Sequence, residues 1–209
     1  MTAILKVDTI QDTSGNNIIN ENANTITIGA SGDTVDIPSG VTFDVTGATV
    51  TGLSAGITMS DSWILDADVT ISGSNILLNT SSLVRSSVPT TGFIGTGMSY
   101  SSGYFTFPST GIYQITVYYD ITTTTSQDLS LKIWTTTDNS TYNQRTAAYT
   151  YAVANVLTSG VSNFVFDVTD TSTHKVGLYY YAVGGGTTKL RGNASQAETQ
   201  ITFTRLGDT

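Results

Sequence analysis

The sequence contains a single histidine, His174, so the acid–base chemistry open to it is narrow. One histidine excludes a metal centre built from several imidazoles and leaves a Ser-His-Asp arrangement as the only histidine-based catalysis. His174 stands in the run Thr171–Lys175, which is typical of a turn that enters a strand. We therefore expect a structural histidine that forms hydrogen bonds near the surface, and we assign no catalytic residue.

Three pairs of aspartates could act as a general acid and base. Hydrolysis of a glycosidic bond needs two carboxyl groups that face each other about 5 to 9.5 Å apart. Nothing in the sequence selects a pair for that geometry, and Asp66 with Asp68 fits a solvated edge of a strand. The sequence therefore favours a protein that is not an enzyme, with a glycan depolymerase as the least favoured alternative. The three pairs are Asp33 with Asp36, Asp66 with Asp68, and Asp167 with Asp170.

The sequence predicts no cofactor and no metal centre of its own. Cysteine is absent, which excludes disulfides and thiolate metal sites. The ordered calcium loop of the EF-hand kind is also missing, and only a calcium ion on a symmetry axis stays open as an alternative. Gly184–Gly186 lacks the Lys-[Ser/Thr] pair of a phosphate loop. We expect these glycines to form a hairpin tip between Tyr179–Tyr181 and Thr187–Leu190.

One loop has the residue types of a sugar contact. Tyr142 could stack on the apolar face of a sugar ring, while Asp138 and Asn139 could form hydrogen bonds with its hydroxyl groups. The alternative, which we favour for any single loop, is that these residues serve the geometry of a turn. Asn139-Ser140-Thr141 matches a glycosylation motif, which has no meaning without a secretory route.

Composition limits the partners of the protein. The formal net charge is −8 and charged residues make up 11% of the chain. Nucleic-acid binding needs clustered Lys and Arg, and no basic stripe is present, so we expect no nucleic-acid partner. The N-terminal run Met1–Gly15 lacks the apolar core of a secretory signal. No stretch approaches the roughly 20 apolar residues of a membrane span, so we expect no membrane insertion.

The elements that must position these residues are strands. No window shows a sustained helical period, whereas β-branched and aromatic residues alternate between turn residues. We predict an all-β chain whose large C-terminal part is a two-sheet sandwich or jelly roll. The predicted buried faces are Tyr113, Ile115, Val117 and Tyr119; Leu129, Leu131 and Ile133; Phe164, Phe166 and Val168; and Val176, Leu178 and Tyr180. The predicted turns are Asp138–Ser140, Thr158–Gly160, Asp170–Thr173 and Gly184–Gly186.

A different pattern occupies residues 25–52. Apolar residues come there in short sets of the same parity, each closed by glycine or Pro-Ser-Gly, which predicts very short strands. Such strands are too short to form an independent sheet, so the rest of the chain or another chain must cover them. The sets are Ile26 with Ile28, Val35 with Ile37, and Val41 with Phe43 and Val45.

Several sequence blocks resemble known families. Gly103–Tyr113 and the closing strand Thr202–Leu206 resemble the complement globular-head and tumour necrosis factor class of jelly rolls. Further blocks resemble a head module of fibre-type proteins from marine tailed bacteriophages, and Leu5–Ile10 resembles their leader. These further blocks are Trp63–Leu65, Arg85, Ile94–Met98, Thr136–Tyr142, Phe166–Thr169, Ser172–Val176 and Arg205–Thr209.

The resemblance implies an organisation and a function. Residues 1–22 would be a leader that docks on another virion protein through Ile4, Val7 and Ile10. Residues 23–56 would form a trimeric β-repeat stem, since this jelly-roll class associates as trimers, and residues 57–209 would form the jelly-roll head. The implied protein is a homotrimeric virion fibre of the tail-fibre type that contacts a host surface glycan or protein. A capsid decoration protein or head fibre is the alternative. Either would be made in the host cytoplasm without a signal peptide and lie on the virion surface.

Overall fold

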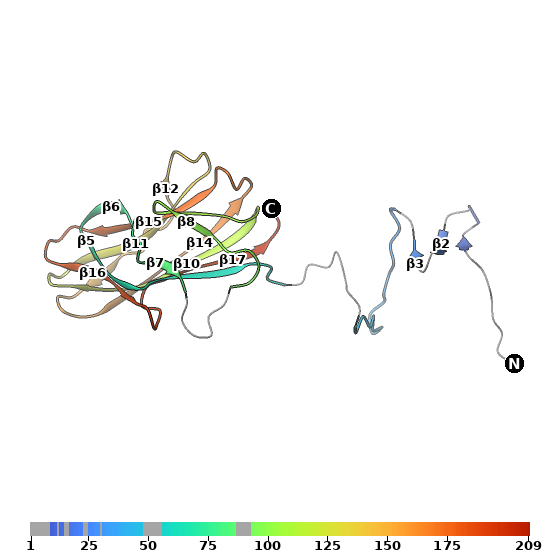
Figure 1. Cartoon of the computed structure of the whole chain (residues 1–209), viewed down its shortest axis with the longest axis horizontal. Helices are drawn as coiled ribbons and strands as arrows, with labels where there is room; N and C mark the ends of the chain where they lie inside the picture. The colour runs from blue at the N-terminus through green and yellow to red at the C-terminus, as the bar shows by residue number, and fades with distance from the viewer. Residues whose placement is uncertain are drawn as a thin grey trace. The chain divides into compact units, whose positions relative to one another are not determined.

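The computed structural model describes residues 9–11, 13–14, 17–22, 25–29, 31–47, 56–86 and 93–209. The chain divides into two compact units, Met1–Leu53 and Ser54–Thr209. Within the described residues every regular element is a β-strand, which confirms the predicted all-β class (Figure 1).

The N-terminal unit contains a small antiparallel sheet in the order β1-β2-β3. Its strands are β1 (Thr9–Gln11), β2 (Asn17–Asn22) and β3 (Thr25–Ile28). The predicted strand at Ile26 and Ile28 is therefore present as β3. The strands predicted at Val35–Ile37 and Val41–Val45 are wrong, because residues 31–47 contain turns and no strand. A strand needs a hydrogen-bonding partner, and β3 pairs only with β2 among the described residues.

The Ser54–Thr209 unit, which we call the head, is built from two antiparallel sheets (Figure 1). Sheet 1 follows the order β5-β16-β10-β17-β4-β7, with β14 also paired to β10. Its strands are β4 (Ser60–Leu65), β5 (Ala67–Ile71), β7 (Leu83–Arg85), β10 (Gly111–Thr123), β14 (Thr158–Val168), β16 (Thr188–Asn193) and β17 (Gln200–Gly207). Sheet 2 follows the order β12-β11-β15-β9-β8, with β13 on β11 and β6 on β15. Its strands are β6 (Gly73–Leu77), β8 (Ser99–Ser101), β9 (Tyr104–Thr106), β11 (Gln127–Thr136), β12 (Asn143–Gln144), β13 (Thr150–Ala152) and β15 (Lys175–Ala182).

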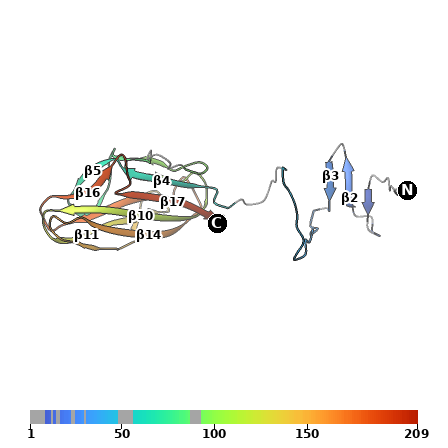
Figure 2. The same ribbon diagram turned by 90° about the horizontal axis from the view of Figure 1, so that it is seen from below.

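The core of the head lies between the sheets, and β10 contributes most to it. Figure 2 shows β10 running along the head beside β14 and β17, with which it pairs. Its predicted inward face is confirmed, since Tyr113, Ile115, Val117 and Tyr119 are all fully buried. The predicted faces of β11 and β15 are also buried, apart from Tyr180, which packs against the core while partly exposed. On β14, Phe166 and Val168 are buried and Phe164 is partly exposed.

Two predicted turns are different in the structure. Thr158–Gly160 begins β14, and the turn comes earlier, at Val153–Leu157. Gly160 stands opposite Tyr119 of β10, and a Cβ atom there would lie 2.2 Å from the Tyr119 ring. The glycine thus makes room for an aromatic ring rather than a turn. Gly184–Gly186 is a loop but not a hairpin tip, because β15 before it belongs to sheet 2 and β16 after it to sheet 1.

The head has two opposite ends. At the entry end, the chain enters β4 at Ser60, which pairs with Thr204 near the C-terminus, and β10 begins at Gly111. At the other end, which we call the apex, β10 finishes at Thr123 and β11 begins. The apex loops are Thr124–Ser126, Val153–Leu157 and Val183–Thr187.

Replacing Tyr113 tests this description of the core. The ring is fully buried against Phe107, and its hydroxyl donates a hydrogen bond to the Ser109 carbonyl at 2.9 Å. We expect Tyr113→Ala to lower the free energy of unfolding by about 3 to 5 kcal/mol in urea titrations. The control Tyr151→Ala removes a ring that is 63% exposed and should stay within about 0.5 kcal/mol. Equal effects of the two substitutions would show that the buried face is assigned wrongly.

Candidate functional site

The predicted contact loop Asp138–Tyr142 follows the end of β11, at the entry end of the head. The Asp138 carboxylate accepts hydrogen bonds from the backbone N–H groups of Thr141 at 2.7 Å and Ser140 at 2.9 Å. It also accepts one from the Thr136 hydroxyl at 2.7 Å. These bonds, that of Thr141 first, lower the pKa of Asp138. The carboxylate therefore holds the turn, as the alternative interpretation of this loop predicts.

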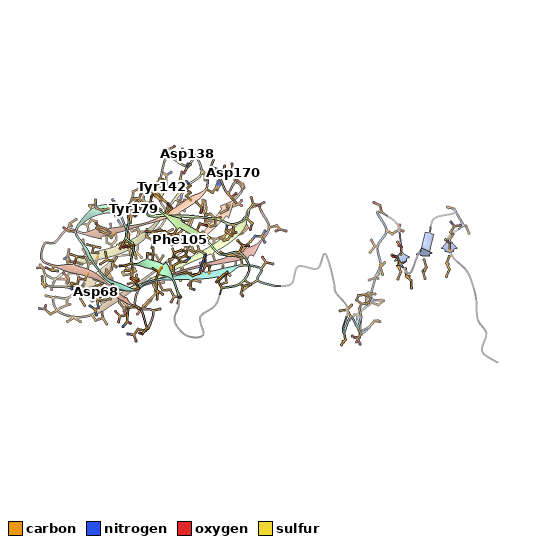
Figure 3. The ribbon with its side chains drawn as sticks, viewed as in Figure 1. Asp68, Phe105, Asp138, Tyr142, Asp170 and Tyr179 are labelled. Atoms are coloured by element: carbon orange, nitrogen blue, oxygen red, sulfur yellow. The ribbon has the colours of Figure 1, made fainter. Side chains whose placement is uncertain are left out.

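Asn139 joins this loop to a neighbouring turn. It adopts a left-handed backbone with φ of 58°, and its N–H donates to the Thr173 carbonyl at 3.1 Å. Figure 3 shows Asp138 and Asp170 near each other and far from Asp68. In the neighbouring turn, Asp170 accepts hydrogen bonds from the hydroxyl and the N–H of Ser172, which lower its pKa. Both exposed carboxylates of this region therefore stabilise turns.

Tyr142 belongs to an aromatic cluster on the outer face of sheet 2. The cluster consists of Tyr104, Trp134, Tyr142 and Tyr179. The Tyr142 ring stacks on Tyr104 with centroids 4.4 Å apart, and Trp134 stacks on Tyr179 at the same distance. The hydroxyls of Tyr104 and Tyr179 lie 3.3 Å apart and join the two stacks. Burial, with Tyr104 and Asp138 nearby, raises the pKa of Tyr142 to about 12. One face of the Tyr142 ring is thus occupied by Tyr104, and this stacking holds the Asp138–Tyr142 loop against sheet 2.

His174 is buried and has structural partners. Its Nε2 lies 3.3 Å from the Thr169 hydroxyl, and its Nδ1 lies 3.1 Å from the Thr173 hydroxyl. The ring also stacks on Phe166 with centroids 5.5 Å apart. Both ring nitrogens therefore face threonine hydroxyls, and a catalytic triad needs a carboxylate on one nitrogen and a nucleophile on the other. The interpretation of His174 as a structural residue fits this geometry.

The aspartate pairs occupy different surroundings. Asp33 and Asp36 are exposed in the N-terminal unit, and Asp167 and Asp170 are exposed near the end of β14. Asp66 and Asp68 are partly exposed at an edge of sheet 1, since β5 is an edge strand, but only Asp68 lies on β5 and its carboxylate is paired. Arg191 donates to Asp68 Oδ2, the Gly192 N–H donates to Oδ1 at 3.2 Å, and Lys189 Nζ lies 3.7 Å away. The paired strand β16 supplies these groups.

Sequence reasoning missed Asp61, a buried charge of the head. Its side chain is inaccessible to solvent and accepts hydrogen bonds from Arg85 Nε at 3.0 Å and from the Trp63 indole N–H at 3.0 Å. The N–H of Met98 donates to it at 2.8 Å. Asp61 thereby joins three of the blocks on which the phage resemblance rests. Gly97 packs directly against this carboxylate and leaves no space for a side chain, because a Cβ atom there would lie 2.5 Å from Asp61 Oδ2.

Of the three predicted docking residues, the structure describes Ile10. Ile4 and Val7 fall outside the described residues. Ile10 lies on β1, which pairs with β2 in the part of the chain that the structure describes, and its side chain is 40% exposed. Docking through these residues stays a prediction.

Two kinds of feature are absent from the described residues. No group of three or more His, Cys, Asp or Glu side chains in this part of the chain is placed to hold a metal ion. The same residues include no helix with the length and apolarity needed to cross a membrane.

The Asp61 site generates a stability prediction. Arg85→Leu leaves a buried carboxylate without its cation, so we expect unfolding free energy to fall by at least about 2 kcal/mol. Adding Asp61→Asn should restore part of that loss, since the amide keeps an oxygen for the Met98 N–H without the charge. Urea unfolding of the wild type, both single variants and the double variant measures the coupling. Strictly additive effects would contradict a pairing between the two side chains.

The head resembles solved structures of the tumour necrosis factor type. Eiger TNF from S. frugiperda superposes with a TM-score of 0.53 at 12% identity, covering 73% of this chain and 95% of that chain. Murine APRIL superposes with a TM-score of 0.51 at 10% identity, covering 71% and 98%. No protein-family model matches the sequence, and a search of curated proteins gives no match. At these identities the likeness concerns the fold, and it confirms the predicted jelly-roll sandwich.

Proposed function

We propose that the protein is a homotrimeric virion fibre that docks through its N-terminal residues and presents the head to the host surface. The observation that carries this proposal is the exposure of apolar residues in the segment 25–43. All of its large apolar side chains are exposed, with values between 44% and 71%. They are Ile26, Ile28, Val35, Ile37, Val41 and Phe43.

Exposure on this scale supports an interaction surface in this segment. Single exposed apolar residues are normal, but a continuous series of them marks an interaction surface. Pro38 and Gly40 interrupt the series, and charged residues in it are few. Identical chains side by side can bury the same residues from one another without any further protein, as in repeat structures that cannot bury their apolar face alone. A stem of three chains is therefore the arrangement that we favour.

The head has a second apolar surface along β14. This strand pairs with β10 alone, so its other edge is free of strand partners in the described structure. Val161 and Val165 on its outward face are 48% and 51% exposed, and Tyr118 stands opposite Val161 on β10. The outer face of sheet 1 also contains uncharged hydrogen-bonded pairs, such as the hydroxyls of Ser62 and Thr202, which lie 3.0 Å apart. A contact between this edge of one head and the outer face of the next would be heterologous, and it forms a closed ring if the rotation between neighbouring heads closes.

The virion location is supported by the sequence resemblance to phage fibre proteins. The predicted docking residue Ile10, 40% exposed on the short strand β1, suits strand addition onto another virion protein. Three heads per fibre and many fibres per particle would raise avidity by roughly 10² to 10⁴ over a single contact. The same architecture fits the alternative, a capsid decoration protein or head fibre.

The molecular mass in solution tests the trimer. One chain has a mass of 22.1 kDa, and we expect light scattering of the full chain to give three times that value. Val41→Asp with Phe43→Asp places charges among the exposed apolar residues of the stem and should weaken or abolish the trimer. Thr42→Asp adds a charge between these two positions without removing an apolar side chain and serves as the control. A wild-type mass of one chain would refute the proposal.

Measuring the adsorption of particles to host cells distinguishes a host-contacting fibre from a capsid decoration protein. If the protein is a host-contacting fibre, particles without it should adsorb poorly, and an excess of the purified full chain should compete with intact particles for cells. Particles that adsorb normally but lose capsid stability on heating would instead identify a decoration protein. Cryo-electron microscopy of the virion would show which component receives the N-terminal residues.

A further inference from the structure

A hollow whose lining includes several side chains with polar groups lies at the apex of the head, opposite the entry end. It has a volume of about 300 Å³, at the lower end of the range for small-ligand pockets. The β10 end supplies Thr122 and Thr123 to its lining, and β16 supplies Lys189. Two apex loops add Asn155 and Thr187, and Thr124 completes the set.

The walls of the hollow are held by a buried hydrogen-bond network. Gln127 Nε2 has two hydrogens to donate and lies 3.0 Å from the hydroxyls of Thr123 and Thr188 and 3.2 Å from the Gly185 carbonyl. Its Oε1 accepts the N–H of Gly184 at 2.7 Å. This side chain thus joins the end of β10, the start of β16 and the glycine loop. Sites supported in this way hold their ligand groups in place before binding.

The apex loop Val153–Leu157 is also hydrogen-bonded to β10. The N–H of Asn155 donates to the Thr123 carbonyl at 2.7 Å, and Asn155 adopts a left-handed backbone with φ of 62°. The N–H of Thr187 donates to the Thr124 hydroxyl at 2.9 Å. Three apex segments far apart in the sequence therefore converge on one hollow.

Several side chains around the hollow retain unused hydrogen-bonding groups. Within the described structure, no hydrogen bond engages the Lys189 ammonium, the Asn155 amide group or the hydroxyls of Thr122 and Thr187. Lys189 is 44% exposed and lies 3.7 Å from Asp68, beyond hydrogen-bond distance. Both oxygens of that carboxylate already accept hydrogen bonds from Arg191 and Gly192. The ammonium thus forms an ion pair with Asp68 but donates no hydrogen bond to it, and its three donors stay available to a ligand carboxylate beside the hollow.

The chemistry of these groups selects a class of ligand. Hydroxyl and amide groups form hydrogen bonds with the hydroxyls of a sugar ring, and an ammonium group pairs with a carboxylate in a charge-assisted hydrogen bond. No aromatic side chain lines the hollow in the described structure, so stacking contributes nothing. An acidic sugar matches this set better than a neutral sugar or an apolar ligand.

The position of the hollow agrees with a role in contact. The loop Asp138–Tyr142 lies at the entry end, where the chain joins the segment that would form the stem. The apex lies at the opposite end of β10, away from that junction. We infer that the hollow at Thr122, Asn155 and Lys189 binds the acidic sugar of a surface glycan; this inference rests on the proposed function of the head as the host-contacting part.

Calorimetric titration of the full chain tests the site. The probes are two oligosaccharides that differ only in the terminal residue, a hexuronic acid in one and the neutral hexose in the other. We expect the acidic probe to bind on the order of tenfold more tightly. Lys189→Gln should remove that preference, because the amide cannot pair with a carboxylate as a cation does. Thr122→Val should weaken binding of both probes.

Lys175→Gln is the matched control. It removes one positive charge at the entry end of β15, far from the hollow, and should leave both affinities unchanged. Absence of binding to either probe, equal binding of both, or an unchanged preference in Lys189→Gln would overturn the inference. The mass and adsorption measurements are independent of these titrations. A trimer that aids adsorption but binds neither probe would refute the sugar site and leave the fibre intact.

Discussion

The pairing of β10 with β14 and β17 is the constraint on which the rest of the head depends. Every second side chain of β10 from Tyr113 onward is fully buried, so the register with both neighbours decides which residues meet in the core. A shift by one residue would turn this face outward. It would also remove Gly160 from its place opposite Tyr119, where no other side chain fits. The register of the sandwich thus depends on the long strand β10 and on the glycine at position 160 beside it.

Polar groups inside the head fix its ends. Asp61 with Arg85 ties β4 and β7 to the Met98 backbone near the entry end, and Gln127 ties the apex loops to sheet 1. Apolar packing is non-directional and would tolerate several loop arrangements, whereas hydrogen bonds require defined distances and angles. The two networks therefore position loops, while the core supplies the stability.

The sequence predicted the strands of the head better than their connections. Alternation identified the inward faces of β10 and β11 because burial follows the period of the strand itself. It misplaced the turn at Thr158–Gly160, since a glycine that admits a ring from another strand has the same local signature as a glycine in a turn. Asp61 was missed for a related reason. Its partners Arg85 and Met98 are distant in the sequence, and local residue patterns do not predict contacts between distant residues. The hollow at the apex is assembled from segments equally far apart, so only the fold reveals it.

The pairing of Ser60 with Thr204 and of Ile112 with Gly207 places the chain entry and the C-terminus of the head at one end. For protein engineering, this means that a peptide fused after Thr209 emerges beside the incoming chain. A cargo intended for display away from that junction belongs in an apex loop instead. The position between Val156 and Leu157, whose side chains are 50% and 57% exposed, is more suitable than Val183–Thr187, where an insertion would break the hydrogen bonds of Gly184 and Gly185 with Gln127.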